Sequence, residues 1–530
     1  MTRKLLTLLL ITILTCTTKA QTRGFFKSYE VKTVAEFSRI SSLVMTYDSA
    51  FIIACESFDS ISLVPSLELL KINTFGQFMW RKTFQFPDHA YNIQVVETPD
   101  SGIVITTTTN YLDTIPMIAM IKTDRFGTKQ WVKLFGDNHI SQQNFSLAIK
   151  GNTVFVLSRG AVKLGGGQYE NCYFIACTDL NGNLNWYKKF NWQGAPFPKT
   201  MALSSNKEIF VAAEILPGGN PQFALSKIDS NGNIVWSKVY DPHYEIDAWN
   251  MILDSENNLV ITGRTGAINL NAWDIFLMKM DTAGNFLWAK TFGGGMQDMF
   301  NDEGYVVFQT QNGYMICAEP ESFGNKSRAA LMQTDYNGNL QWMKIYGDTT
   351  GSFPNGAIQL NDGYVVYGIK GNFSDKAPIY LMKTDLNGET TCKWSSVTFP
   401  DSSFTISPSD TGTSGNVQGA MTFDYSEFVN TLVETDECET TSILFIPSYS
   451  FSFQTTPNPF HNEFTLTIQK QNLNQLSITI QNVLGQTVFN EQQLGFATSK
   501  TIDLRGQSNG MYFLDLTIDG ERIIKKIIKK

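Results

Sequence analysis

The sequence is poor in several residue types and motifs, and each shortage excludes a class of protein. Charged residues make up only 17% of the 530 residues, and the formal net charge is −8. This composition excludes a coiled coil or a disordered chain, and it argues against a nucleic-acid-binding protein, which normally has a basic face. The motifs of a nucleophile elbow, a zinc protease, a P-loop and a Rossmann fold are also missing.

Long apolar runs are missing after the first twenty residues, where the pattern is that of a secretory signal peptide. A basic start is followed by an apolar run at residues 5–14 and a small-residue cleavage site at Thr18-Lys19-Ala20. A lipoprotein signal at Cys16 ranks second, because the residues before that cysteine suit it poorly. No later run approaches the ~18 residues needed to cross a bilayer. We therefore predict a signal peptide at residues 1–20 and no transmembrane segment in the mature chain.

Cysteine is scarce, and no Cys-x-x-Cys pair is present, so no zinc or redox motif is expected. Cys55, Cys177 and Cys317 lie in apolar runs and are predicted to be small buried residues. Cys392 and Cys438 are the one pair for which we predict a disulfide, which export would permit. The alternative is that both remain free thiols.

What the chain has in abundance is a repeat with the pattern Asp-x-x-Gly-x-x-x-Trp-x-Lys-x-Phe/Tyr. Its tryptophans follow one another at intervals of 50 to 55 residues. A repeat of this length built from short strands is typical of a propeller or a similar array. The repeat tryptophans are Trp80, Trp131, Trp186, Trp236, Trp288 and Trp342.

Each repeat predicts four strands. The second strand is a nearly continuous apolar run, which implies burial on both faces. In the fourth strand Trp, Lys and Phe/Tyr alternate and so share one side. We expect these aromatic rings to pack on the next sheet, with the lysine stem between them and its amine in water. The Asp-x-Asn-Gly segment before the fourth strand predicts a tight hairpin turn.

Seven third strands are present but only six complete fourth strands. The last repeat keeps Asp385 and Gly388 but has Cys392 in place of the tryptophan. The missing spacing occurs at the other end of the chain, in Phe25-Phe26-Lys27-Ser28-Tyr29. An N-terminal strand that completes the last repeat would close the ring and leave no open sheet edge. The sequence therefore predicts a seven-bladed β-propeller over residues 21–396.

The remainder predicts two further parts. Residues 397–454 are rich in Ser, Thr, Asp and Gly and are predicted to be a linker or accessory segment with some strand content. Residues 455–530 alternate apolar and polar residues over six or more short strands, which predicts a compact β-sandwich of two sheets. The whole chain is thus predicted to be all-β, a propeller followed by a small C-terminal β-sandwich.

The C-terminal part resembles the type A sorting domain of the type IX secretion system of Bacteroidetes. The resemblance covers residues 455–530 and rests on five stretches in order: Pro457-Asn458-Pro459-Phe460, Asn482-Val483-Leu484-Gly485-Gln486, Asp503-Leu504, Ser508-Asn509-Gly510-Met511-Tyr512 and the terminal run 522–530. It implies export through the periplasm and across the outer membrane by the type IX machinery. It further implies that the domain is usually cleaved, and that the product is secreted or attached to the outer cell surface.

The repeat is also similar to the Gly-x-x-x-Trp element of quinoprotein-type propellers. That resemblance supports the fold but implies no quinone, because there is no vicinal cysteine pair and no metal ligands can be placed. The repeated Asp-x-Asn-Gly-Asn segment resembles the start of a calcium loop, although it lacks the distal glutamate of such a site. We therefore expect structural turns and no cofactor, with calcium as the alternative.

The candidate ligand-binding residues lie in the connections between fourth and first strands and between second and third strands. These connections should emerge together, opposite the tight turns, and binding residues concentrate on loops held by a rigid scaffold. In three repeats a histidine follows the tryptophan by seven to nine residues. The alternative is that turn-forming and aromatic residues simply populate loops. The candidates are Asp88, His89, Asp137, His139, Asp241, His243, Trp249 and Trp273.

These observations predict a non-catalytic exported or cell-surface protein that binds a glycan or protein ligand through its loop face. One alternative is a carbohydrate-active hydrolase or lyase with a carboxylate site at the propeller mouth, since propeller enzymes assemble sites from scattered loop residues. Two carboxylates about 5 to 10 Å apart there would favour the enzyme. The other alternative is a structural surface protein, which an apolar or plugged mouth would favour.

Overall fold

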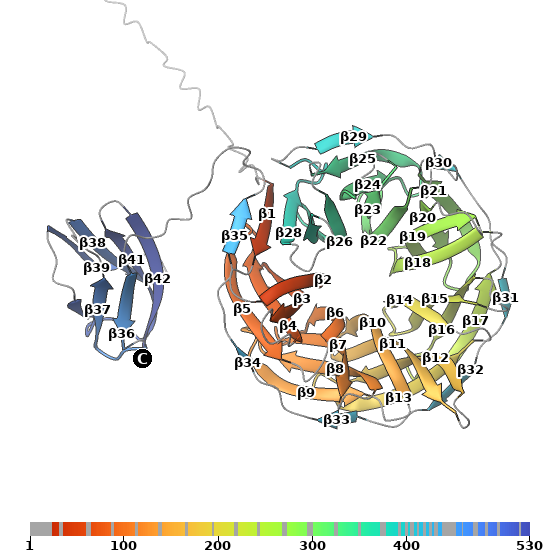
Figure 1. Cartoon of the computed structure of the whole chain (residues 1–530), viewed down its shortest axis with the longest axis horizontal. Coiled ribbons are helices and arrows are strands. Elements are labelled where there is room, and N and C mark those ends of the chain that lie inside the picture. Colours follow the sequence, from red (N-terminus) through yellow and green to blue (C-terminus); the bar gives the residue numbers. More distant parts are fainter. Residues whose placement is uncertain are drawn as a thin grey trace, which may run out of the picture. The chain divides into compact units, whose positions relative to one another are not determined.

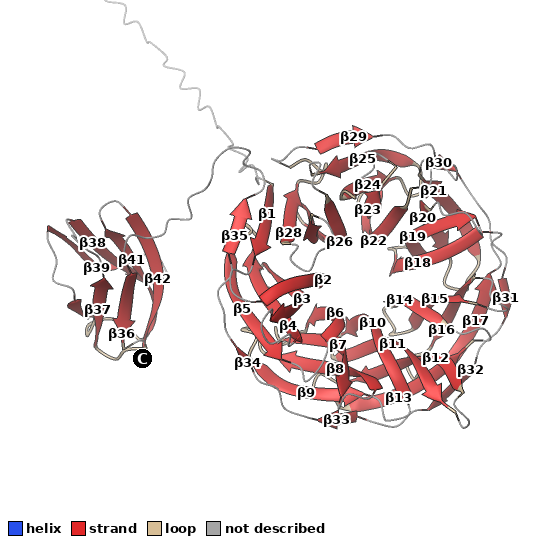
Figure 2. Ribbon diagram, in the orientation of Figure 1, coloured by secondary structure: helices blue, strands red, loops and turns tan. Residues whose placement is uncertain are grey.

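The computed structural model describes most of the chain from residue 24 onward, as two compact units, Met1–Glu439 and Thr440–Lys530. In the described part of the chain every regular element is a β-strand and there is no helix (Figure 2). This confirms the prediction of an all-β chain. The signal peptide and the predicted disulfide partners Cys392 and Cys438 lie outside the described residues. The described ranges are 24–30, 35–59, 65–85, 90–111, 115–135, 140–164, 168–192, 196–216, 221–240, 244–267, 273–293, 300–322, 327–347, 351–371, 378–390, 394–397, 401–402, 408–410, 413–416, 420–422, 427–428, 433–436, 452–457, 459–469, 475–482, 486–494, 499–518 and 521–530.

The first unit contains seven antiparallel five-stranded sheets, which follow one another around a ring (Figure 1). We number the sheets by their place in the chain. Sheet 1 has β2 (Ala35–Met45), β3 (Ala50–Asp59), β4 (Pro65–Asn73) and β5 (Phe78–Gln85); sheet 2 has β6 (Ala90–Glu97), β7 (Ile103–Tyr111), β8 (Ile115–Thr123) and β9 (Lys129–Phe135). Sheet 3 has β10 (Ile140–Lys150), β11 (Thr153–Lys163), β12 (Tyr169–Thr178) and β13 (Leu184–Asn191); sheet 4 has β14 (Phe197–Leu203), β15 (Ile209–Ile215), β16 (Gln222–Ile228) and β17 (Ile234–Tyr240). Sheet 5 has β18 (Tyr244–Leu253), β19 (Leu259–Ala267), β20 (Asp274–Met280) and β21 (Phe286–Phe292); sheet 6 has β22 (Asp302–Thr310), β23 (Gly313–Pro320), β24 (Ala330–Thr334) and β25 (Leu340–Tyr346). Sheet 7 has β26 (Ser352–Leu360), β27 (Gly363–Lys370), β28 (Ile379–Thr384) and the N-terminal strand β1 (Phe25–Glu30).

The core of this unit lies between the sheets. Seven clusters of buried apolar side chains each join one sheet to the next. One of them contains Tyr29 and Leu381 of sheet 7 together with Phe51 and Leu70 of sheet 1. The inner strands also contact each other in a cycle, from β2 through β6, β10, β14, β18, β22 and β26 back to β2. The apolar second and third strands are therefore covered on both faces by neighbouring sheets.

The repeat motif forms the joint between one sheet and the next. In sheet 5 the turn before β21 contains Gly284, whose φ of +79° favours glycine. A Cβ at this position would lie 3.0 Å from Trp236 and 2.8 Å from the hydroxyl of Tyr240, both on β17 of sheet 4. The amine of Lys238 donates to the carbonyl of Ala283 at 2.7 Å. The fourth strand of sheet 4 thus packs its Trp, Lys and Tyr on the tight turn of sheet 5.

The N-terminal strand takes the corresponding place in sheet 7. Strand β1 pairs with β28, with Phe25 opposite Lys383 and Tyr29 opposite Ile379. Gly76, in the turn before β5 of sheet 1, lies against Phe25 and Lys27. Phe25, Lys27 and Tyr29 of β1 therefore occupy the positions that Trp, Lys and Phe or Tyr hold in the other sheets.

Seven further short strands add a fifth member to each sheet; six of them lie in the segment 397–454 predicted to be a linker, and the first, β29, spans the predicted boundary with the propeller. Each pairs antiparallel with the outermost of the four strands described above. Their positions along the rim are visible in Figure 1. The strands are β29 (Trp394–Val397), β30 (Asp401–Ser402), β31 (Pro408–Asp410), β32 (Thr413–Asn416), β33 (Ala420–Thr422), β34 (Glu427–Phe428) and β35 (Val433–Asp436).

The second unit has two antiparallel sheets around one apolar core. Phe460, Leu504, Tyr512 and Ile527 are among its buried residues. The amide of Phe460 donates to the carbonyl of Ile528 at 2.9 Å, which ties the Pro-Asn-Pro-Phe motif to the last strand. One sheet has β36 (Ser452–Thr456), β37 (Glu463–Gln469) and β40 (Ser499–Asp503); the other has β39 (Thr487–Leu494), β38 (Gln475–Asn482), β41 (Gly510–Ile518) and β42 (Glu521–Lys529).

Candidate functional site

A group of charged and aromatic side chains gathers at one end of sheets 5 and 6. This is the end at which the first strand of a sheet begins and the second strand finishes, so it is the loop face of the sequence prediction. Four strands supply the group, β18 and β19 of sheet 5 and β22 and β23 of sheet 6, together with the residue just before β20. We call it the Arg264 cluster; it comprises Asp247, Trp249, Arg264, Trp273, Glu303, Tyr305 and Glu319.

Two of the eight predicted ligand-binding residues belong to this cluster. Trp249 and Trp273 both lie against Arg264 and are neither fully buried nor fully exposed. The other six predicted residues fall outside the described part of the chain: Asp88, His89, Asp137, His139, Asp241 and His243.

Arg264 holds the cluster together. Its guanidinium carbon lies 4.5 Å from the ring centroid of Trp273 and 5.2 Å from that of Trp249, within the range of a cation–π contact. Its Nη1 lies 2.6 Å from a carboxylate oxygen of Glu303, and its Nε lies 3.3 Å from Asp247. Asp247 is also the cross-strand partner of Arg264 in the register of β18 and β19. One cation therefore fixes two indole rings and two carboxylates.

The backbone of sheets 5 and 6 sets the position of Trp273. Its amide donates to the carbonyl of Phe300 at 3.2 Å, and its carbonyl accepts from the amide of Asp302 at 2.8 Å. The buried carboxylate of Asp302 in turn accepts hydrogen bonds from the amide and hydroxyl of Ser322. Trp273 is thus held between the two sheets by main-chain hydrogen bonds, while its ring lies against Arg264.

Two carboxylates face one phenol in sheet 6. Glu303 and Glu319 are directly opposite each other in the register of β22 and β23, where two like charges would repel. The hydroxyl of Tyr305 lies 3.0 Å from a carboxylate oxygen of Glu303 and 2.8 Å from one of Glu319. A phenol has one hydrogen, so it can donate to only one of them at a time. Tyr305 also makes an edge contact with the ring of Trp249 at 4.9 Å.

Burial changes the protonation of this pair. It raises the pKa of Glu319 to about 7, helped by repulsion from Glu303 and Glu321, against the hydrogen bonds from Ser327 and Tyr305. Burial also raises the pKa of Glu303, although the charge of Arg264 opposes the rise. Near neutral pH a protonated Glu319 can donate to the Tyr305 oxygen while Tyr305 donates to Glu303. That arrangement removes the repulsion between the two carboxylates.

Charged side chains continue from the cluster into sheet 4. The amine of Lys199 lies 2.6 Å from Asp247 and 3.3 Å from Glu214. Burial, together with the charges of Glu214 and Asp247, raises the pKa of Glu245. A row of alternating charges therefore crosses from sheet 4 to sheet 6 on the loop face.

Sequence reasoning missed the other five members of the cluster: Asp247, Arg264, Glu303, Tyr305 and Glu319. A signal for two of them is present, because Arg264 and Glu319 stand at the ends of otherwise apolar runs in β19 and β23. A charged residue in such a position needs a partner, since an unpaired charge is costly to bury. The sequence alone does not show which residue is that partner, because this depends on how strands pair and how neighbouring sheets pack.

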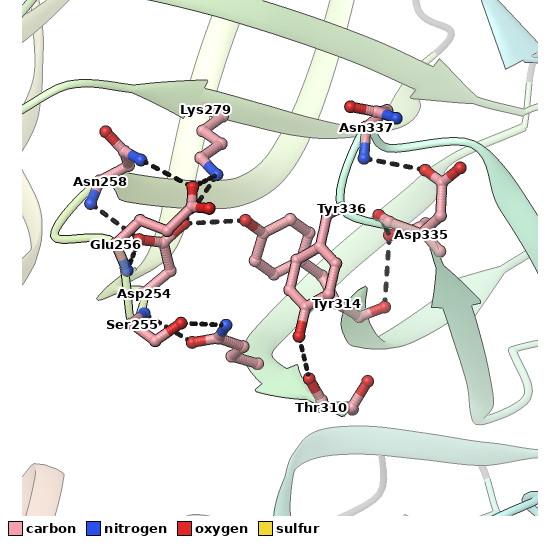
Figure 3. A network of polar contacts seen from close by, with 12 residues as sticks. Asp254, Ser255, Glu256, Asn258, Lys279, Thr310, Tyr314, Asp335, Tyr336 and Asn337 are labelled. Atoms are coloured by element: carbon pink, nitrogen blue, oxygen red, sulfur yellow. Dashed lines mark hydrogen bonds and ion pairs between the residues drawn. The ribbon is translucent and has the colours of Figure 1, made fainter. Parts of the chain in front are cut away.

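The opposite face carries a polar network of a different kind (Figure 3). The amine of Lys279 lies 2.9 Å from Asp254 and 3.0 Å from Glu256, and the hydroxyl of Tyr314 donates to Asp254 at 2.9 Å. Similar pairs between a third-strand lysine and the turn after the first strand occur in four other sheets: Lys71–Asp48, Lys122–Asp100, Lys227–Glu208 and Lys383–Asp362. Because the pairs recur from sheet to sheet, we assign them to the architecture of the repeat.

The repeated Asp-x-Asn-Gly turns use their carboxylates internally. In Asp179 one oxygen accepts from the amides of Asn181 and Asn183, each at 2.8 Å, and the other accepts from the Asn183 side chain. Partial burial opposes ionisation, but these hydrogen bonds outweigh it and lower the pKa of Asp179. In the described ranges no group of three or more His, Cys, Asp or Glu side chains is arranged to hold a metal ion. The described cysteines Cys55, Cys172, Cys177 and Cys317 are buried free thiols, which confirms the predicted burial of three of them.

Comparison with known proteins identifies the C-terminal part. Residues 455–530 match the family described as the secretion system C-terminal sorting domain. The chain is therefore exported by the type IX secretion system, to the cell surface or into the medium, and its sorting domain interacts with that machinery. The described part of the chain contains no helix that is long and apolar enough to span a membrane. No characterised protein gives a significant sequence match.

Several solved structures show a distant likeness. A protein of unknown function from Dyadobacter fermentans is 13% identical, with 56% of this chain and 94% of that chain covered and a TM-score of 0.38. The β-1,2-mannobiose phosphorylase of Listeria innocua is 12% identical, with 68% and 97% covered and a TM-score of 0.27. Latent PorU of Porphyromonas gingivalis is 12% identical, with 76% and 36% covered and a TM-score of 0.14. With such low TM-scores, none of these likenesses bears on function.

Proposed function

We propose that this chain is an exported seven-bladed β-propeller that binds a glycan or protein ligand without catalysis, through the face that carries the Arg264 cluster. Seven sheets in a ring, with seven apolar interfaces between them, support the propeller. The second unit supplies the export signal, and the ring supplies the scaffold for recognition. Loops and strand ends on such a scaffold are where binding residues concentrate.

The observation that carries the proposal is the pair of indole rings held against one guanidinium. Trp249 and Trp273 are partly exposed, and Arg264 fixes both. Rigid aromatic side chains with a polar edge give large contact area at low entropic cost, and Trp and Arg are the residues most enriched at binding hot spots. A sugar ring, with an apolar face and hydroxyls at its edge, fits indole faces beside charged groups.

Asp247 and Glu303 support a binding role because both carboxylates already pair with cationic side chains of the protein. Asp247 pairs with Lys199 and Arg264, and Glu303 pairs with Arg264 and Tyr305. These ion pairs stiffen the surface on which the two tryptophans stand. A rigid site loses less entropy when it binds, which favours affinity.

A second candidate function is a hydrolase or lyase acting on a carbohydrate. It is favoured by Glu303 and Glu319, whose carboxyl groups both contact the hydroxyl of Tyr305. The pKa of Glu319 is raised to about 7, so this group can keep a proton near neutral pH. Two carboxylates with different pKa values are the usual basis of acid–base catalysis on glycosides. Both groups are largely buried among protein partners, so we rank this function below binding.

Titration of the full-length protein with a panel of neutral and acidic oligosaccharides tests the proposal. A bound sugar at 100 times its dissociation constant should stabilise the protein by about 2.7 kcal/mol. Trp273→Ala should weaken that binding by about tenfold or more, as expected of a central aromatic contact. Phe126→Ala, which removes an exposed aromatic ring on the opposite face, is the control and should leave binding unchanged.

Three outcomes would separate the candidates. Equal affinity of the Trp273→Ala variant and the wild type would exclude the Arg264 cluster as the site. Release of reducing sugar that is lost in Glu319→Gln would favour the enzyme. Binding of no oligosaccharide, together with Trp273-dependent binding of a protein from the cell surface, would identify a protein ligand.

A further inference from the structure

The seven short strands β29 to β35, which lie within residues 394–436 and which we call the strap, make one circuit of the ring. They join sheet 6 first, then sheets 5, 4, 3, 2 and 1, and finally sheet 7. In Figure 1 the strands β29 to β35 lie along the outer rim in that order. The strap therefore passes every sheet, in the reverse of the order in which the chain builds them.

Each strap strand covers an edge that would otherwise be open. The fourth strand of a sheet has a neighbour on its inner side only, so its outward backbone groups would have no partner within the sheet. The strap supplies that partner over two to four residues per sheet, for example Lys188 to Asn191 opposite Thr413 to Asn416. An extended peptide that adds to the edge of a sheet is held by main-chain hydrogen bonds of the same kind.

The end of the strap meets the beginning of the ring. Strand β1 lies between β28 and β35, with Tyr29 paired to Ile379 on one side and to Glu434 on the other. Without β35, the N-terminal strand would be an edge strand held by one neighbour. With β35 it becomes an interior strand of sheet 7, and interior strands open less readily than edges.

We propose that the strap locks the ring shut. It holds β1 in sheet 7, and it ties each sheet to the next by one continuous length of chain outside the apolar interfaces. Opening the joint between sheet 7 and sheet 1 then requires release of β35 as well as separation of the buried side chains. The locked ring is complete only once Asp436 is in place, a few residues before the second unit begins at Thr440.

The composition of the strap fits a role carried by the backbone. The segment is rich in Ser, Thr, Asp and Gly and has no long apolar run. The attachment that the structure describes is main-chain pairing of the seven strands. This inference does not depend on the proposed ligand, because it concerns the outer edges of the sheets and not the loop face.

Hydrogen exchange followed by mass spectrometry on the full-length protein tests the lock. Strap amides in the paired stretches should exchange at least about tenfold more slowly than in an unfolded peptide, as paired strands do. Exchange of these amides at the rate of an unfolded peptide would overturn the proposal.

A matched pair of variants tests the coupling between strap and N-terminal strand. Glu434→Pro removes an amide donor from β35 and places a ring where the strands meet, whereas Glu434→Ala keeps the backbone intact. The proline variant should speed exchange of the β1 amides about tenfold or more, and the alanine variant should not. Unchanged β1 protection in the proline variant would contradict the lock. If the proline variant does not fold, the proposal is judged by the exchange rates of the strap amides in the wild-type protein.

Discussion

The hydroxyl of Tyr29 donates a hydrogen bond to the carbonyl of Gly76 at 2.8 Å, and this bond joins sheet 7 to sheet 1. Tyr240 makes the same bond to Gly284 at 2.7 Å, and Tyr346 makes it to Gly388 at 2.6 Å. The joint between the two ends of the ring therefore has the hydrogen bond found at two of the joints inside it; at the other four joints the corresponding residue is phenylalanine. A strand from the N-terminus can close the ring because it carries the aromatic-x-Lys-x-aromatic spacing of the repeat.

Removal of the Tyr29 hydroxyl should weaken the closing joint. In Tyr29→Phe the ring stays in place but the buried Gly76 carbonyl loses its donor, and loss of one partner of a buried hydrogen bond costs about 1–3 kcal/mol. Urea unfolding should show a lower midpoint with an unchanged slope. Tyr240→Phe should give a similar loss, and Tyr169→Phe, at an exposed position, should give none. A Tyr29→Phe midpoint equal to that of the wild type would show that the joint does not depend on this bond.

Alanine substitutions at two glycines distinguish the free-energy cost of backbone strain from the cost of disturbed packing. Gly284 and Gly151 both have positive φ, at +79° and +59°. A Cβ at Gly284 would meet Tyr240 and Trp236 at 3.0 Å or less, whereas a Cβ at Gly151 would meet nothing within 4 Å. Gly151→Ala should therefore cost only the backbone term, about 1 kcal/mol.

Gly284→Ala should cost more than Gly151→Ala, by roughly 1–3 kcal/mol, because an added methyl group must displace the packed motif. Denaturant midpoints of the two variants measure the difference. Equal losses of stability would mean that the Trp-Lys-Tyr motif can move away from the turn at no cost, and that it does not fix the joint.

The repeat was predictable because its signals are local. Asn-Gly turns, alternating fourth strands and apolar second strands each depend on residues close together in the chain, so they predict the strands and their order. The strap was predicted only as a linker with some strand content, because its attachment uses backbone pairing that leaves little trace in residue type. The Arg264 cluster was predicted in part. Trp249 and Trp273 stood out as aromatic residues near loops. Glu303 reaches Arg264 only because sheets 5 and 6 pack side by side, and Glu319 joins the cluster only through the register of β22 and β23 and the hydroxyl of Tyr305.

Deletion of residues 455–530 should stop export. These residues match a secretion system sorting domain and form a unit with its own apolar core, so the first unit can fold without them but has no signal for the type IX machinery. We expect the truncated chain to accumulate inside the cell, as measured by fractionation and immunoblotting. Normal appearance of the truncated chain in the medium or on the cell surface would contradict this role.

The carboxyl group of Glu319 should make stability depend on pH. Burial raises its pKa from 4.5 to about 7 in the folded protein, so the folded state binds more protons than the unfolded state between these values. The contribution of the protonated Glu319 carboxyl to folding stability is therefore fully present below pH 4.5 and is lost as the pH rises towards 7. Above pH 7 this contribution changes little. A shift of this size corresponds to roughly 3 kcal/mol, from 1.36 kcal/mol per pKa unit.

Glu319→Gln should remove this part of the pH dependence, since glutamine stays neutral and can still donate to Tyr305. Thermal unfolding of both proteins from pH 4 to pH 8 measures the difference: the wild type should lose stability relative to the variant as the pH rises through 5 and 6. Glu303 and Glu321 titrate nearby, so the comparison must be made between the two proteins at each pH. Parallel curves would mean that Glu319 loses its proton at an ordinary pH. The repulsion between the cross-strand carboxylates would then have to be balanced by Arg264 and by the hydrogen bond from Tyr305.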